Sequence, residues 1–215
     1  MNPHDITKSF EQAICDYTGA PYCVTVDNES NALFMALKYE GIEGKEITIP
    51  SHTYPSVPCE IIFAGGIVKF EDSPRFLKGA YQLKPTKVID SALHFTADMY
   101  VPDTLMCLSF TGQWKHLKIC KGGAILTDSF DAYLWLKRFR YSGRRECSYH
   151  DDNLDMLGYN FYLPHVLASI GLQQILGFYN QDGTKKTMED LELPYPDLSK
   201  FSIYKPTIFG NTSTT

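Results

Sequence analysis

Long apolar runs and leader segments are both missing from this chain. None of its 215 residues belongs to a stretch that approaches the roughly 20 apolar residues of a membrane-spanning helix. Residues 1–5 have no basic segment, and no apolar segment of the secretory type follows them. We therefore expect a cytoplasmic protein with no membrane partner.

The sequence also lacks an excess of basic residues. It has 20 Lys and Arg against 25 Asp and Glu, which gives a formal net charge of −5. A chain with this balance has no electrostatic reason to bind a nucleic-acid backbone or an anionic lipid surface. We expect no nucleic-acid partner, and the expected ligand is a small molecule or another protein.

Paired cysteine motifs are absent as well. The six cysteines include no C-x-x-C, and several lie in apolar, strand-like runs where a reduced thiol packs as a small hydrophobe. We expect neither a metal site nor a disulfide framework. No internal repeat or low-complexity tract is found.

Short apolar runs alternate with segments of helical periodicity. The strands are expected at residues 22–26, 46–50, 67–72, 87–90, 105–110 and 124–127, and the helices at 7–17, 32–39, 57–64, 130–140 and 163–178. This order predicts an α/β fold with a mostly parallel sheet flanked by helices and a ligand site at the carboxyl ends of the strands. We expect one domain over residues 1–180 and an extended tail over 181–215, with an irregular segment between residues 73 and 85.

A polar loop lies between two of these runs and carries Lys115 seven residues before Gly122. A lysine held between buried strands loses its proton more readily than a free one, so it can form a Schiff base with a carbonyl. The alternative is a surface loop whose cations serve no chemistry.

Polar residues follow two other strands. Asn28, Glu29 and Ser30 precede a helix, where backbone N–H groups and the helix dipole favour an anion. Asn28 or Ser30 serves equally well as a helix cap. Tyr54 follows a strand and is placed to cover a flat ligand, although it is also suited to a half-buried structural position.

The strand from Lys87 runs into Asp90, and His94 follows four residues later. An acid here is able to pair with a protonated ring nitrogen of a cofactor. The alternative is that Asp90 only caps the next turn.

Five motifs follow one another along the chain. They occupy residues 10–19, 26–33, 47–72, 115–123 and 158–175. In order and spacing they resemble the large domain of the DegT/DnrJ/EryC1/StrS family of sugar aminotransferases, which use pyridoxal phosphate (PLP) and have the fold type I of the aspartate aminotransferase superfamily. The resemblance extends over roughly residues 8–178 and implies the PLP-dependent transferase large-domain fold.

The resemblance also implies roles for single residues. Lys115 would hold PLP covalently and later move a proton, and Asp90 would pair with the pyridinium nitrogen. Tyr54 would stack on the ring. The remaining cofactor-binding positions would be Asn28, Glu29, Ser30, His94, Ser109 and, reaching the phosphate of a neighbouring subunit in a homodimer, Asn160.

The activity implied is transfer of an amino group, with glutamate as donor, to the keto group of a nucleotide-linked sugar. A PLP-dependent sugar dehydration is the alternative among enzymes, because His116 lies beside Lys115 and that reaction uses histidine in place of the lysine. A non-catalytic binding or scaffold protein is the alternative outside enzymes, and a partner chain that completes the site is a further one.

Several positions depart from the family pattern. The family has its serine five residues before the lysine, whereas Ser109 precedes Lys115 by six. The acid is expected three residues before its partner, so an ungapped alignment would place Ser91 where we expect Asp90. Glu29 stands where the family has glycine, and Tyr162 where it has arginine.

Two larger pieces of the family's fold are missing. About one βα unit is absent between Asp72 and Lys87, and so is most of the small domain beyond residue 178. Because a small domain closes over the substrate, we expect its loss to affect turnover more than cofactor binding.

Overall fold

The computed structural model of the protein describes residues 4–204, and the last part of the predicted tail lies outside them. The helices are α1 Asp5–Thr18, α2 Glu29–Tyr39, α3 Ser56–Phe63, α4 Phe130–Phe139 and α5 His165–Ile175. The strands are β1 Tyr22–Val26, β2 Glu46–Pro50, β3 Ile67–Glu71, β4 Phe76–Gln82, β5 Val88–Leu93, β6 Leu105–Ser109, β7 Gly123–Thr127 and β8 Glu192–Pro194. Within the described range, no helix is long and apolar enough to cross a bilayer.

Six strands form one sheet in the order β1-β7-β6-β5-β4-β8, and β2 pairs with β3 separately. The predicted α/β class is confirmed, but the sheet is mixed and not mostly parallel. Only the β5–β6 and β2–β3 pairs are parallel. The physical reason is that β6 and β7 are joined by a loop and not by a crossover helix, so the chain returns antiparallel.

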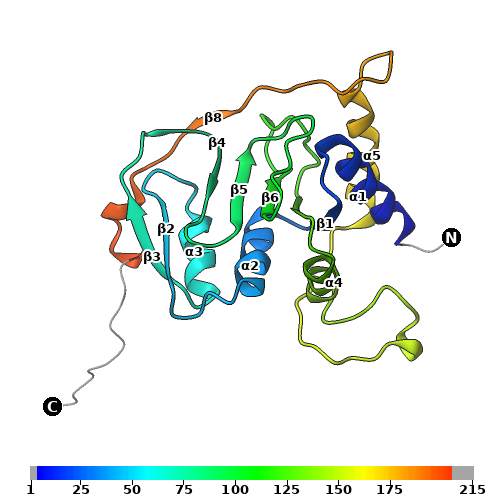
Figure 1. Cartoon of the computed structure of the whole chain (residues 1–215), viewed down its shortest axis with the longest axis horizontal. Coiled ribbons are helices and arrows are strands. Elements are labelled where there is room, and N and C mark those ends of the chain that lie inside the picture. The colour runs from blue at the N-terminus through cyan, green and yellow to red at the C-terminus, as the bar shows by residue number, and fades with distance from the viewer. Residues whose placement is uncertain (1–3, 205–215) are drawn as a thin grey trace.

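The sheet buries both of its faces (Figure 1). Along β6, Leu105 and Cys107 join one core cluster with α2, while Met106 and Leu108 join another with α1 and α5. This alternation is the period of two that a pleated strand imposes on its side chains. Helices therefore cover both faces, and the carboxyl end of β6 is fixed in a rigid core.

Strand β4 occupies the segment that we expected to be irregular. It pairs antiparallel with β5 on one side and with β8 on the other. Its side chains are mostly exposed or half-buried, so it lacks the apolar run that marks a buried strand. The separate β2–β3 pair joins this region through mutual backbone hydrogen bonds between Thr48 and Lys84.

The described part of the tail runs along the core, as the orange segment of Figure 1 shows. Leu191 N donates to Leu93 O at 2.9 Å, β8 adds to the edge of β4, and Leu198 N donates to Ser51 O at 2.8 Å. Leu198 is buried. The tail thereby links β5, β4 and the loop after β2.

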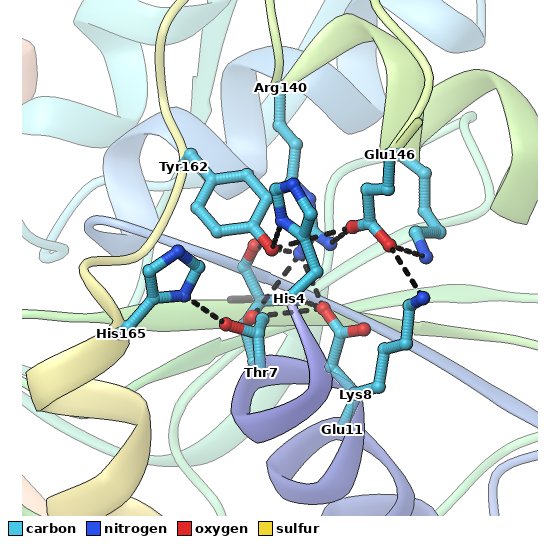
Figure 2. A network of polar contacts seen from close by, with 10 residues as sticks. His4, Thr7, Lys8, Glu11, Arg140, Glu146, Tyr162 and His165 are labelled. Carbon is cyan, nitrogen blue, oxygen red and sulfur yellow. Dashed lines mark hydrogen bonds and ion pairs between the residues drawn. The ribbon is translucent and has the colours of Figure 1, made fainter. Parts of the chain in front are cut away.

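A buried ionic cluster ties α1, β1, α4 and the following loop together (Figure 2). Arg140 is 0% exposed; its guanidinium bonds to Glu11 and to Thr25 O, and it lies 3.1 Å from Glu146 and 4.7 Å from the Tyr162 ring. Burial alone would lower the pKa of Arg140, but Glu11 together with Tyr162 and Glu146 holds it above its ordinary value. This Arg140 cluster joins the edge strand β1 to α1 and to the end of α4.

Candidate active site

A cavity of about 680 Å³ opens beside the carboxyl ends of β5 and β6. Its size lies within the usual range for small-molecule sites. The residues that line it are Asn28, Glu29, Ser30, Tyr54, Ala92, Ser109, Thr111, Gly112, Trp114, Lys115, Cys120, Lys121, Leu193, Pro194 and Tyr195. Six of the residues chosen from the sequence are among them.

The cavity is bordered by the N-terminus of α2. Asn28 has extended backbone, and its Oδ1 accepts from Asn31 N at 2.9 Å, so Asn28 caps the helix. Ser30, in the first turn, lines the cavity. Asn28 therefore provides the cap, while anion binding at Ser30 in the same turn stays a prediction.

Gly123 lets β7 approach this turn closely. A Cβ at Gly123 would lie 2.7 Å from Glu29 N and 2.8 Å from both Asn28 C and Leu108 O. All three contacts are with backbone atoms, which cannot rotate away. Glycine is therefore required here for the helix start and the lysine loop to border the same cavity.

Lys115 is 8% exposed, and its Nζ donates to the carbonyl oxygen of Ala92 on β5. Burial lowers the pKa of Lys115, while the nearby Glu29 and Asp90 oppose that shift. The sequence predicted a lysine that is readily deprotonated between two strands, and the structure places the lysine in that setting. A partly desolvated amine facing a cavity is the form a Schiff-base lysine takes.

The lysine loop accommodates its extra residue through Gly112. This glycine has φ 120°, and the Trp114 ring lies against it, 3.0 Å from where a Cβ would be. Lys115 N closes the turn by donating to Gly112 O at 3.3 Å. Ser109 lines the same cavity, so the spacing of six residues does not remove it from the site.

Asp90 lies behind the cavity wall at 4% exposure. Its Oδ2 accepts from the Tyr81 hydroxyl at 2.8 Å, and its Oδ1 accepts from Ala92 N at 2.9 Å. Ser91 is buried with no hydrogen-bond partner for its Oγ in residues 4–204. Because successive strand residues face opposite sides, it is Asp90, and not Ser91, that faces Lys115 and Glu29.

Glu29 directs its carboxyl group toward Asp90. The residue is half-buried, but its Oε1 is fully buried and has no hydrogen-bond partner among the described residues. Burial, followed by the charge and hydrogen bonding of Asp90, raises the pKa of Glu29 well above its ordinary value, and Lys115 opposes this only in part. The family pattern, which has glycine here, gave no reason to expect a second acid.

The tail also forms a wall of the cavity, through Leu193, Pro194 and Tyr195. Tyr195 lies edge-on to Tyr54 with ring centroids 6.2 Å apart. Burial and then the charges of Asp90 and Glu29 raise the pKa of Tyr195, so its hydroxyl lies within the field of the carboxyl pair. Tyr54 remains 57% exposed at the cavity, as a residue that covers a ligand would be.

Two predicted site residues lie elsewhere. His94 Nδ1 pairs with Asp190 Oδ1 of the tail at 2.5 Å, and neither residue lines the cavity. Asn160 is exposed and forms a backbone bridge with Tyr141. Their roles toward a cofactor, like those of the other chosen residues, stay predictions.

The fold and the site together define the large-domain type of PLP-dependent transferases. The model of the DegT/DnrJ/EryC1/StrS aminotransferase family matches residues 3–88 and 102–191, and the chain belongs to this family. Asp90 and His94 lie in the gap between the two matched segments. The structure therefore locates a candidate acid that the family match leaves out.

Individual relatives agree with this assignment. UDP-4-amino-4,6-dideoxy-N-acetyl-beta-L-altrosamine transaminase of Campylobacter jejuni is 22% identical, over 77% of this chain and 55% of its own length. PseC of Helicobacter pylori matches with a TM-score of 0.64 at 14% identity, over 80% of this chain and 57% of that one. CalS13, a sugar aminotransferase of Micromonospora echinospora, matches with a TM-score of 0.65 at 19% identity, over 80% and 60% of the two chains.

These structural matches show the fold. The chain spans about half the length of the curated relatives it matches.

Proposed function

We propose that the protein is a PLP-dependent aminotransferase that acts on the keto group of a nucleotide-linked sugar, with glutamate as the amino donor. The observation that carries the proposal is Lys115, a buried amine with a lowered pKa, held against the cavity and facing Asp90. Family membership implies PLP as the cofactor. The curated relatives named as nucleotide-sugar transaminases support the substrate class.

The residues present fit this cofactor. The Lys115 amine suits the aldehyde, the Asp90 carboxylate suits a cationic ring nitrogen, and the N-terminus of α2 suits the phosphate. Glu29 Oε1 is buried without a partner within residues 4–204, so the chain leaves the pairing of this carboxyl group incomplete. Bound there, PLP supplies the electron sink that transamination requires.

The protein's own groups do the remaining work. Lys115 binds the cofactor and, once released, moves a proton at the substrate carbon. Tyr81 and the backbone N–H of Ala92 hold Asp90 in place, and Thr53 lies 2.6 Å from the Tyr81 hydroxyl to extend that support. Tyr54, Trp114 and the tail exclude water from one side of the cavity.

The proposal has two further parts. We propose a homodimer in which Asn160 serves the site of the neighbouring subunit, and its exposure leaves it accessible to a second copy. We also propose a cytoplasmic location, because nucleotide-linked sugars are the expected substrates.

The test combines an absorption spectrum with the transfer of an isotope-labelled amino group. Protein incubated with PLP is expected to show a visible absorption band that borohydride reduction makes covalent, and a ketosugar with nitrogen-labelled glutamate is expected to yield a labelled aminosugar. Lys115→Ala should lose the band, whereas Lys121→Ala, which changes another cavity lysine, should keep it. A band that persists in Lys115→Ala would show that the assignment of the lysine is wrong.

A non-catalytic binding protein is the second candidate, and the acid at Glu29 favours it. In that case the folded protein would show neither a band nor thermal stabilisation by excess PLP, since a ligand bound only by the folded state must raise apparent stability. The dehydratase alternative has less support, because Lys115 is present and His116 Nε2 bonds to Glu189 O, at 2.8 Å, outside the cavity lining.

A further inference from the structure

Glu29 gives this site a carboxyl group that the family pattern lacks. It is the first residue of α2, it lines the cavity, and its buried Oε1 has no partner within residues 4–204. Asp90 of β5 is buried, and its charge and hydrogen bonding act on the Glu29 carboxyl group. Two carboxyl groups thus share one water-poor corner of the cavity.

The charges of this corner do not balance when both acids are ionised. Lys115 is the cation that faces the pair, and its own pKa is lowered by burial. Two adjacent carboxylates with such a weak counter-charge are strongly disfavoured, so one of them retains a proton. Asp90 accepts hydrogen bonds from Tyr81 and Ala92, and burial together with Asp90 raises the pKa of Glu29 well above its ordinary value, so Glu29 carries the proton.

Other titratable groups face Glu29 without supplying a positive charge. Tyr81 on β4, Cys107 on β6 and Tyr195 of the tail each have a pKa raised by burial first and then, in part, by Glu29 and Asp90. All three are therefore neutral near pH 7. Lys121 also lines the cavity, but it is paired with Asp27 at 3.7 Å.

We propose that Glu29 and Asp90 form a proton-sharing carboxyl pair that receives the ring nitrogen of the cofactor, with Glu29 donating the proton that this nitrogen then carries. The inference rests on the proposed cofactor. In the step, the O–H bond of Glu29 breaks, the oxygen keeps its electron pair, and the lone pair of the nitrogen forms an N–H bond. Glu29 would then become a carboxylate, and the positive charge gained by the nitrogen would offset the negative charge gained by Glu29.

The proposal predicts how binding depends on protons. At a pH above the pKa of the free cofactor's ring nitrogen, the wild-type protein brings its own proton, whereas Glu29→Gln and Glu29→Gly, the latter restoring the family's residue, must take one from solvent. Each variant should therefore take up about one more proton than wild type when PLP binds. As pH rises, its affinity for PLP should fall relative to that of wild type by up to about a factor of ten per pH unit. Because Glu29 also acts on the pKa of Lys115, a difference in proton release at that lysine is present with a cofactor analogue that lacks the ring nitrogen as well, and it is subtracted.

Two measurements test this without using activity. Quenching of the fluorescence of Trp114, which lines the cavity, gives the PLP dissociation constant at each pH. Calorimetry in two buffers of different ionisation enthalpy gives the number of protons taken up. As a control, a PLP analogue with carbon in place of the ring nitrogen should show no such difference between wild type and the variants.

The outcomes are distinguishable. More proton uptake in both variants than in wild type, abolished with the analogue, supports the pair. Equal proton uptake in proteins that all bind PLP through Lys115 overturns this inference and leaves the proposed function standing. Absence of PLP binding in all three overturns both, and melting curves of the variants verify that each is folded.

Discussion

Two buried clusters of charged side chains differ in how completely their charges are paired. In the Arg140 cluster a guanidinium lies between Glu11 and Glu146, and Glu11 Oε1 also accepts from Thr25 N and Oγ1, each at 2.9 Å. In the cavity, Glu29 and Asp90 face one lysine, and Glu29 Oε1 has no partner in the described structure. The charges of the first cluster are paired within the described residues, although Arg140 Nε has no hydrogen-bond partner there, whereas the second cluster is short of a positive charge.

This difference separates a structural role for the Arg140 cluster from a binding role for the charged groups at the cavity. A buried charge that is fully paired holds elements together, and removing its partner leaves the other charge stranded. A buried charge that the chain leaves uncompensated costs stability, which a protein tolerates where a ligand completes the pairing. Substitutions in the first cluster should therefore damage the fold, and those in the second should change binding.

The largest expected effect is that of Arg140→Met. It leaves Glu11 buried without its cation, so the free energy of unfolding should fall by about 3–5 kcal/mol. Urea denaturation measures this. Arg145→Met is the matched control, because its side chain is 48% exposed and 3.8 Å from Asp155, and the loss of such a surface pair should cost less than about 1 kcal/mol. Similar losses in the two variants would contradict the account of the Arg140 cluster.

Gly123→Ala should have the next largest effect. The new methyl group meets three backbone atoms at 2.7–2.8 Å, so β7 and the start of α2 must separate. The cost expected from overpacking is about 1–3 kcal/mol, together with weaker PLP binding. Gly177→Ala serves as control, since nothing lies within 4 Å of its added Cβ. Unchanged stability in Gly123→Ala would show that the close approach is not required.

Glu29→Gln should have a smaller effect on stability, and one that depends on pH. The pKa of Glu29 is raised in the folded protein, so wild type loses stability as pH rises from the unfolded value through the folded one. The variant lacks this loss, so its stability relative to wild type should increase as pH rises from about 4 towards neutrality.

Melting temperatures of wild type and Glu29→Gln across this pH range test that gain. The pKa of Glu60 is raised by burial to about 7. Glu60 contributes equally to the pH dependence of stability in both proteins, so its contribution cancels in their difference. A difference that stays constant with pH would contradict the raised pKa of Glu29.

The smallest effect concerns the tail. Tyr195→Ala removes the edge-on contact with Tyr54, and because an aromatic pair contributes about 0.5–1.5 kcal/mol, PLP affinity should fall about 2–10-fold. Tyr195→Phe keeps the ring and should bind nearly as wild type does. Fluorescence titration compares them, and equal affinities for all three proteins would remove the tail from the site.

The sequence predicted the lysine loop, the start of α2 and the α/β class because each depends on local patterns of apolar runs and turns. It did not predict β4, whose exposed side chains carry no strand signal and whose pairing depends on β8 of the distant tail. The Glu29–Asp90 pair was missed for a similar reason. The sequence placed an acid near a phosphate, and only the packing of α2 against β5 shows which group that acid meets.

Residue-resolved hydrogen exchange with and without PLP compares the two clusters in one experiment. Addition of PLP is expected to slow exchange at residues 28–31, in the loop 110–122 and at 191–195, which border the cavity, while residues 138–146 around Arg140 remain unchanged. Protection confined to the Arg140 cluster, or no protection around the cavity, would contradict the account. The claim tested is that a ligand completes the charged group at the cavity and not the Arg140 cluster.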